Sequence, residues 1–248
     1  MGKNNLIFGI HPLIEALEAG REIDKILLKR GLRSSEVSHI MDVAKERMIP
    51  VQIVPEERLP RLTRKQHQGV IAFISEIEYT QLDQLIPMLY EEGRSPFVVL
   101  LDGLTDVRNF GAIARTAECA GVDAIIIPER GSVSVTADAV KTSAGALHRI
   151  PVCRVSSIQA AVTLLQENGI QIVAASEKAA DIYTESELSL PLGLVLGAED
   201  HGVSQDVLRR ADKIVRIPQV GAIGSRNVSV AGGILIYEVV RQAGLGAE

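Results

Sequence analysis

The stretch PFVVLLDGLTDVRNFGAIAR, residues 96–115, determines the predicted fold. It opens with a continuous apolar run, 97–101, and continues through a polar loop. Behind the loop, Phe110, Ile113 and Ala114 recur at the spacing of one helix face. A short apolar run bounded by proline or charge is typical of a strand that is buried on both faces. The stretch therefore predicts a buried strand, a loop and a helix that begins near Arg108.

The same alternation continues to the end of the chain. The further apolar runs are 124–127, 170–175, 192–196 and 214–217. Helical patterns lie between or after them at 158–165 and 228–242, the first of these behind Ser156 and Ser157 as predicted N-caps. Strands that alternate with helices indicate an α/β fold with a parallel sheet. With four Phe, four Tyr and no Trp, the core of this fold must be mainly aliphatic.

The first 78 residues alternate in shorter units. Helical patterns cover 11–18 and 37–48, and short apolar runs at 26–28, 51–54 and 70–74 predict strands. A polar segment follows, helical in pattern over 81–92, before Gly93 and Pro96 break it. We therefore predict a first domain at 1–78, a linker at 79–95 and a second domain at 96–248.

The charge is divided unevenly between these two parts. Residues 1–78 contain 12 Lys and Arg against 11 Asp and Glu, a net charge of +1, and the remaining residues contain 14 against 20, a net charge of −6. A basic cluster ends the first part, formed by Arg58, Arg61, Arg64 and Lys65 and followed by His67 and Gln68. Such a cluster either follows a phosphate backbone or is a solvated loop. No aromatic residue stands beside it in the sequence, so base stacking is not predicted there.

Several classes of protein are disfavoured by what the sequence lacks. It contains no GxGxxG after a strand, no GxxxxGK[ST], no GxSxG and no HExxH. No apolar run approaches 18 residues, and the N-terminal residues do not resemble a signal peptide, so we expect neither a membrane span nor secretion. Cys119 and Cys153 have no CxxC partner or His cluster, which predicts two reduced, buried thiols and no metal site.

Three loops after predicted strands carry the polar residues of interest, because ligands of open α/β sheets bind at the carboxyl ends of strands. The first loop contains Asn109 and leads to Arg115; six residues at about 100° each separate the two around a helix, so they meet only if Asn109 precedes the helix. In the second, Gly197 and Gly202 bracket Glu199. The third is glycine-rich and ends with Ser225, Arg226 and Asn227 at the start of the last helix. Read singly, each loop has an ordinary structural explanation. Arg115 could be a surface arginine, the Glu199 loop a simple turn, and Ser225 or Asn227 a helix cap.

Taken together, the three loops resemble the ordered motifs of the SpoU/TrmH family of RNA ribose 2′-O-methyltransferases, which belong to the SPOUT class. The matching motifs are Asn109-x-Gly111-x-x-x-Arg115, Gly197-x-Glu199-x-x-Gly202 and Ile217-Pro218 followed by Ser225-x-Asn227-Val228-Ser229. The first part is similar to the group 3 branch of the family, on the motifs FGIHP at residues 8–12 and HQGVIA at residues 67–72. The resemblance is strongest to members that methylate a guanosine in the peptidyl-transferase region of 23S rRNA.

The resemblance implies a fold and a cofactor. The second domain is expected to be a parallel sheet tied in a deep trefoil knot, and the first a small α/β RNA-binding domain similar to a ribosomal protein. The cofactor is expected to be S-adenosyl-L-methionine, held by groups at Leu196, Gly197, Ile217, Gln219 and Arg226. Family members usually have leucine where this chain has Arg226, whose guanidinium would either stack on the adenine or turn outward; we expect it to turn outward and leave only its backbone in contact.

The resemblance also implies residue roles and partners. The expected catalytic residues are Asn109, Arg115, Glu199, Ser225 and Asn227. Arg115 would stabilise the developing alkoxide and Glu199 would hold Arg115, while the basic cluster would bind RNA. The chain is expected to be a cytoplasmic homodimer that acts on large-subunit rRNA. The alternatives are the same reaction on tRNA or on another rRNA nucleotide, and an RNA-binding ribosome-assembly factor without turnover.

Overall fold

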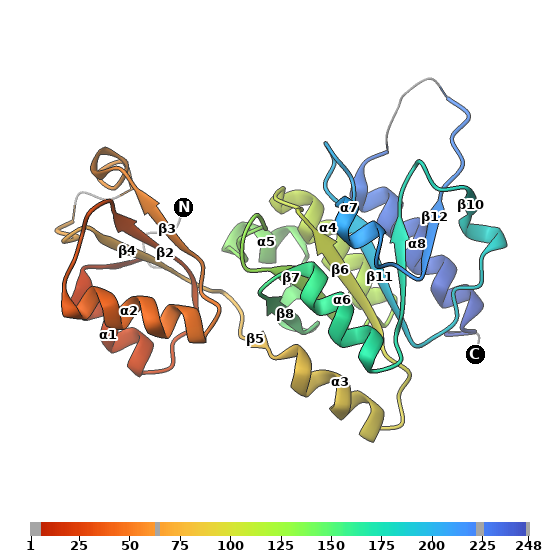
Figure 1. Cartoon of the computed structure of the whole chain (residues 1–248), viewed down its shortest axis with the longest axis horizontal. Helices are drawn as coiled ribbons and strands as arrows, with labels where there is room; N and C mark the ends of the chain where they lie inside the picture. Colours follow the sequence, from red (N-terminus) through yellow and green to blue (C-terminus); the bar gives the residue numbers. More distant parts are fainter. Residues whose placement is uncertain (1–5, 63–64, 222–225, 247–248) are drawn as a thin grey trace. The chain divides into compact units, whose positions relative to one another are not determined.

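A computed structural model describes residues 6–62, 65–221 and 226–246 of the chain. The chain divides into two compact units (Figure 1). The first contains the residues up to 78 together with 134–136, and the second contains the remainder from Tyr79 onward. Each unit has its own hydrophobic core.

The first unit is a four-stranded sheet with the strand order β1-β4-β2-β3. Its elements are β1 (Leu6–Phe8), α1 (Ile10–Glu18), β2 (Ile23–Lys29), α2 (Ser35–Glu46), β3 (Val51–Val54), the 3-10 turn η1 (Glu56–Arg58) and β4 (Val70–Ile74). The two helices share a core with one face of the sheet, in which Leu13, Ile26 and Ile40 are completely buried. The helical and strand patterns predicted for this part are confirmed.

The second unit is built on an eight-stranded sheet with the order β10-β12-β9-β11-β6-β7-β8-β5. Its strands are β5 (Tyr79–Thr80), β6 (Phe97–Asp102), β7 (Ala124–Pro128), β8 (Val152–Val155), β9 (Gln171–Ala175), β10 (Asp181–Ile182), β11 (Leu192–Gly197) and β12 (Lys213–Arg216). All of its strand pairs are parallel, as predicted. The chain returns to the middle of the sheet late, because β11 lies beside β6. The deep trefoil knot stays a prediction.

Helices cover both faces of this sheet (Figure 1). They are α3 (Leu82–Glu91), α4 (Val107–Cys119), α5 (Ala137–Thr142), α6 (Ile158–Glu167), α7 (Gln205–Leu208) and α8 (Val228–Gln242), with 3-10 turns η2 (Ala146–His148) and η3 (Tyr183–Glu185). Ser157 caps α6 as predicted, because its hydroxyl accepts a hydrogen bond from the Ala160 N–H at 3.1 Å. Along α8, Gly232 allows close packing: a Cβ there would lie 2.8 Å from Leu196 Cδ1.

Two predictions about this unit are wrong. The segment 79–95, predicted as a linker, forms β5 and α3 and belongs to the second unit. The physical reason is that Leu82, Leu85, Ile86 and Leu89 form an apolar helix face that a linker would leave in water, and the core buries them. Cys119, predicted to be buried, is exposed at the end of α4, whereas Cys153 is buried. No helix of the described residues is long and apolar enough to span a bilayer.

Candidate active site

A cavity of about 730 Å³ opens at the carboxyl ends of β9, β11 and β12. It is lined by all five residues predicted to hold a cofactor, namely Leu196, Gly197, Ile217, Gln219 and Arg226. Its floor is apolar, with Val228 and Leu235 of α8, and its rim is charged, with Glu177, Lys178 and Arg216 among the lining residues. A cavity of this size accepts a ligand of nucleoside dimensions that has both apolar and charged parts.

Glu199 is presented to this cavity by a tight turn at the end of β11. The Gly202 N–H donates to the Ala198 carbonyl at 2.9 Å, and the two residues form an isolated antiparallel bridge. Gly202 has φ +70°, a conformation that favours glycine. A Cβ on Gly197 would overlap the backbone of Gly202 and Val203. The glycines of this motif therefore close the turn that carries the carboxylate.

Three residues from the three loops meet in one hydrogen-bonded network. Asn109 Nδ2 donates to Glu199 Oε1 at 2.7 Å, and Asn227 Nδ2 donates to the same oxygen at 2.8 Å. Asn227 Nδ2 also lies 2.9 Å from Asn109 Oδ1, which accepts from it. Asn227 Oδ1 accepts from the N–H groups of Ser229 and Val230, so the same side chain caps α8. Asn227 therefore both caps α8 and joins Glu199 to Asn109. Ser225 lies outside the described residues.

Within one chain, Arg115 stands apart from this network, and the expectation that Glu199 holds it stays a prediction. Asn109 is the third residue of α4 and does not precede the helix, so it and Arg115 point in different directions around the axis. Asp106 fixes this helix start, because its carboxylate accepts from the Asn109 N–H at 2.8 Å. Arg115 is exposed, and no hydrogen bond or ion pair of its guanidinium is present within the described part of the chain.

The Arg226 guanidinium binds main-chain carbonyl groups of its own loop. Its Nη1 donates to the Ile217 carbonyl at 3.1 Å and its Nη2 donates to the Pro218 carbonyl. The guanidinium thus ties Arg226, just before α8, to the two residues that follow β12. Two successive carbonyl oxygens give its planar fork a matching set of acceptors. That only the backbone of Arg226 contacts the cofactor stays a prediction.

The predicted RNA-binding residues lie in the first unit, and some have structural partners. Arg58, Arg61 and Lys65 are exposed. His67 Nδ1 accepts from the Gly69 N–H at 3.1 Å, and Gln68 Oε1 accepts from the Ile10 N–H at 3.2 Å. Arg64 lies outside the described residues. Lys65, Arg58 and Arg61 are exposed cations and stay candidates for contact with a polyanion.

Sequence reasoning missed several residues of the site. Gly111 lies where α5 crosses α4: a Cβ there would be 2.7 Å from Thr142 Cβ. Its motif position was recognised, but nothing local in the sequence marks a helix crossing. Asp200 and His201 form a pair with 2.5 Å between Oδ1 and Nδ1, on the turn that carries Glu199. Asp106 could have been found from the sequence, because an Asp immediately before the first helical residue is a common N-cap.

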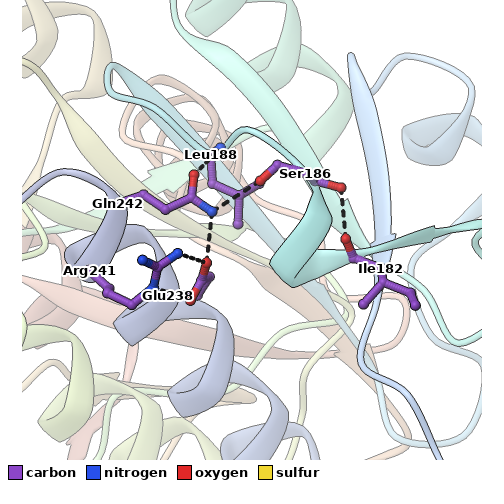
Figure 2. A network of polar contacts seen from close by, with 6 residues as sticks. All are labelled: Ile182, Ser186, Leu188, Glu238, Arg241 and Gln242. Carbon is purple, nitrogen blue, oxygen red and sulfur yellow. Dashed lines mark hydrogen bonds and ion pairs between the residues drawn. The ribbon is translucent and has the colours of Figure 1, made fainter.

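The far end of α8 is fixed by a second polar network, shown in Figure 2. Gln242 Oε1 accepts from the Leu188 N–H at 2.8 Å, and its Nε2 donates to the Ser186 carbonyl at 3.0 Å. The buried Glu238 accepts from Gln242 and, twice, from Arg241. The segment before β11 is thereby held to the helix whose other end carries Asn227.

Comparison with known proteins places both units in one family. A family model described as SpoU rRNA Methylase family matches residues 96–237, and one described as RNA 2′-O ribose methyltransferase substrate binding matches residues 6–80. A TrmH family tRNA/rRNA methyltransferase of Staphylococcus haemolyticus is 38% identical over 237 residues, covering 96% of this chain and 95% of that protein.

Solved structures agree with this placement. The AdoMet-bound rRNA methyltransferase from Sinorhizobium meliloti has a TM-score of 0.61 and 26% identity, covering 96% of this chain and 87% of its own. The A. aeolicus TrmH/SpoU tRNA modifying enzyme has a TM-score of 0.55 and 28% identity, but it covers 65% of this chain and 83% of its own. The two structures thus differ in how much of the present chain they share.

Proposed function

Because this chain belongs to the SpoU rRNA methylase family, we propose that it transfers a methyl group from S-adenosyl-L-methionine to a ribose 2′-hydroxyl of RNA. The observation that carries the proposal is the Asn109–Glu199–Asn227 network beside the cavity at the strand ends. In finer detail, we propose that the enzyme is of the RlmB type, in group 3 of the family. Its substrate would be a guanosine in the peptidyl-transferase region of 23S rRNA, methylated in the cytoplasm.

The extent of the likeness supports rRNA over tRNA. The similar rRNA methyltransferase structure covers 96% of this chain, including the first unit, whereas the tRNA-modifying one covers 65%. Relatives named for both RNA classes keep tRNA as the second candidate. A non-catalytic assembly factor is the third candidate. The network argues against it, because RNA binding alone does not require Glu199, Asn109 and Asn227 to be joined beside a cavity.

The cavity suits the proposed cofactor. Leu196, Ile217 and Leu235 offer apolar surface for an adenine ring. The lining also carries both carboxylates and cations, which suit a ligand with charged groups of both signs. When bound, S-adenosyl-L-methionine supplies a methyl group activated by a sulfonium charge. Arg226 would act here as a positioning residue, because it binds the carbonyls of the cavity-lining Ile217 and of the adjacent Pro218.

The catalytic problem left to the protein is the ribose hydroxyl, which is a poor nucleophile. We propose that Arg115 stabilises the developing alkoxide and orients the neighbouring phosphate, since a guanidinium stays protonated and makes a poor proton acceptor. The network would hold Asn109 and Asn227 against the substrate ribose, with Ser225 ordering the loop. Arg115→Lys tests this role: a near-normal rate with a new ionisation near the pKa of lysine would contradict it and indicate a titrating base.

The separation of Arg115 from Glu199 suggests how a homodimer would contribute. We propose that Arg115 of one copy completes the site of the other. Val230 and Tyr237, 55% and 50% exposed on α8, offer apolar surface for such an association. The inactive variants Arg115→Ala and Glu199→Ala should, when mixed and allowed to exchange subunits, regain up to about one quarter of the wild-type sites, since each heterodimer has one intact site. No recovery despite demonstrated subunit exchange would contradict a shared site.

The direct experiment offers labelled S-adenosyl-L-methionine with unmodified large-subunit rRNA and with unmodified tRNA, and maps the product by primer extension sensitive to ribose methylation. One ribose-methylated guanosine in the peptidyl-transferase region is the expected result. Label in tRNA alone would keep the chemistry and overturn the substrate. Cofactor binding without transfer to any rRNA, including assembly intermediates, would favour the non-catalytic alternative.

A further inference from the structure

The first unit has a second sheet face, on which only the short η1 turn and its flanking residues pack among the residues that the structure describes. On the face opposite α1 and α2, Leu27, Val54, Leu59 and Ile71 form a small buried cluster. Leu6, Phe8 and Phe73 pack against the edge of this cluster and are only partly buried. They come from β1, the edge strand, and from its neighbour β4. We call Phe8 and Phe73, with the lysines described next, the Phe–Lys face.

Each phenylalanine of this face carries a lysine ammonium over its ring. Lys65 Nζ lies 5.2 Å from the centroid of Phe8, and Lys25 Nζ lies 4.8 Å from the centroid of Phe73. Lys25 stands directly opposite Phe73 in the β2–β4 pairing, and its ammonium also donates to Ser134 Oγ at 3.4 Å. The structure thus brings an aromatic ring to the basic cluster that the sequence had placed without one.

The two rings are spaced as neighbours on one surface. Phe8 pairs with Ile71 and Leu6 pairs with Phe73, so Phe8 and Phe73 are diagonal neighbours across the β1–β4 ladder. Diagonal neighbours of an antiparallel pair are about 7–8 Å apart, so the two rings belong to one surface.

The charge around these rings suits a polyanion. Arg58 and Arg61 are exposed on the segment whose Leu59 and Leu62 pack into the small cluster, so their backbone positions are tied to this face. Lys29 Nζ forms an ion pair with Glu56 Oε2 at 2.7 Å. A protein partner would need apolar surface without this concentration of cations, whereas unpaired RNA presents both π-faces and phosphates.

We propose, building on the proposed function, that Phe8 and Phe73 stack on two unpaired bases of the RNA substrate while Lys65 and Lys25 move from the rings to the flanking phosphates. An exposed cation–π contact favours its closed form by only about 2- to 5-fold. Stacking of a base on an aromatic ring favours binding by about 5- to 150-fold. The exchange of ammonium for base is therefore favourable, and the lysine gains a phosphate partner by it.

The test compares full-length variants for binding of two probes by fluorescence anisotropy at one salt concentration. One probe is an unstructured 12-nucleotide RNA, and the other is a ribose-phosphate chain of the same length without bases. Phe8→Leu and Phe73→Leu should each weaken binding of the RNA by about 5-fold or more and leave binding of the baseless chain within about 2-fold. Lys65→Gln should weaken both probes, and Phe8→Trp should keep RNA binding.

Matched controls lie on α2, on the covered side of the sheet. Met41→Ala removes an apolar side chain that is 41% exposed, and Lys45→Gln removes an exposed positive charge. Neither should change the affinity for either probe. Equal effects of Phe8→Leu on both probes, or none, with a normal unfolding transition, would overturn the proposal; Phe73→Leu and Phe8→Trp decide it if Phe8→Leu does not fold.

Two further outcomes distinguish failure of this proposal from failure of the proposed function. A photo-crosslinker at position 8 that labels a ribosomal protein and not RNA in ribosome precursors would assign the face to a protein partner and overturn the proposal. Absence of methyl transfer by the wild-type enzyme would refute the proposed function, while the binding comparison would still decide whether these rings stack on bases.

Discussion

Gly197→Ala provides the sharpest test of how the turn that carries Glu199 is built. The added Cβ would overlap the carbonyl carbon of Gly202 and the nitrogen of Val203, which are backbone atoms and cannot rotate away. The turn must therefore open, which breaks the 2.9 Å bond from Gly202 to Ala198. Glu199 moves with it and loses the bonds from Asn109 and Asn227.

The expected cost follows from these three hydrogen bonds. A neutral bond contributes about 0.5–1.5 kcal/mol and a bond to a charged group about 1.5–3 kcal/mol. Because Glu199 is exposed, the lower ends of these ranges apply. We expect a loss of about 3.5 kcal/mol in the free energy of unfolding or, if the turn alone opens, in cofactor binding. A binding loss of that size raises the Kd by about 300-fold.

Gly193→Ala on the same strand is the matched control. Its Cβ would meet Ile172 Cδ1 at 2.9 Å and Leu100 Cδ1 at 3.2 Å, which are ends of flexible side chains. Overpacking of this kind costs about 1 kcal/mol and should leave the Kd unchanged. Calorimetric titration with S-adenosyl-L-methionine and urea unfolding measure both quantities. If Gly197→Ala matched Gly193→Ala in both, the reasoning about the turn would be wrong.

Three further predictions concern the second unit. Gly111→Ala should lower the free energy of unfolding by about 1–3 kcal/mol, because its Cβ would lie 2.7 Å from Thr142 Cβ. Gly233→Ala, whose Cβ would lie 3.8 Å from Thr116 Cγ2, should be neutral or stabilising. Equal urea midpoints of the two variants would contradict this. Burial raises the pKa of the Cys153 thiol to about 12, so iodoacetamide at pH 8 should modify only Cys119 in the folded protein and both thiols in urea. Hydrogen bonds from Arg241, and to a lesser degree from Gln242, hold the pKa of Glu238 below its usual 4.5. The contribution of Glu238 to the free energy of unfolding is therefore present above pH 4.5 and is lost as the pH falls through the folded-state pKa. The stability difference between wild type and Glu238→Gln should shrink in acid and be constant from pH 5 to 7.

The sequence alone determined which segments become strands and helices. Apolar runs and helical spacing depend on neighbouring residues, so they identified β6, β7, β9, β11 and β12 of the second unit and the last helix, Val228–Gln242. They missed the buried strand β8, Val152–Val155. The N-caps at Ser157 and Asn227 are local in the same sense, because a cap bonds to groups two or three residues away. The resemblance to the SpoU/TrmH family, carried by the motifs, implied five of the residues that line the cavity.

The tertiary structure decided which of these residues meet. Glu199 joins Asn109 because β11 lies beside β6, with Gly197 opposite Asp102, and strand order is not encoded in any local period. The start of α4 at Val107 separated Arg115 from that network, since a shift of a few residues in a helix start turns side chains through large angles. Lys65 and Phe8 meet for the same reason as Glu199 and Asn109: sheet pairing joins segments that are distant in the sequence, and only the folded chain fixes that pairing.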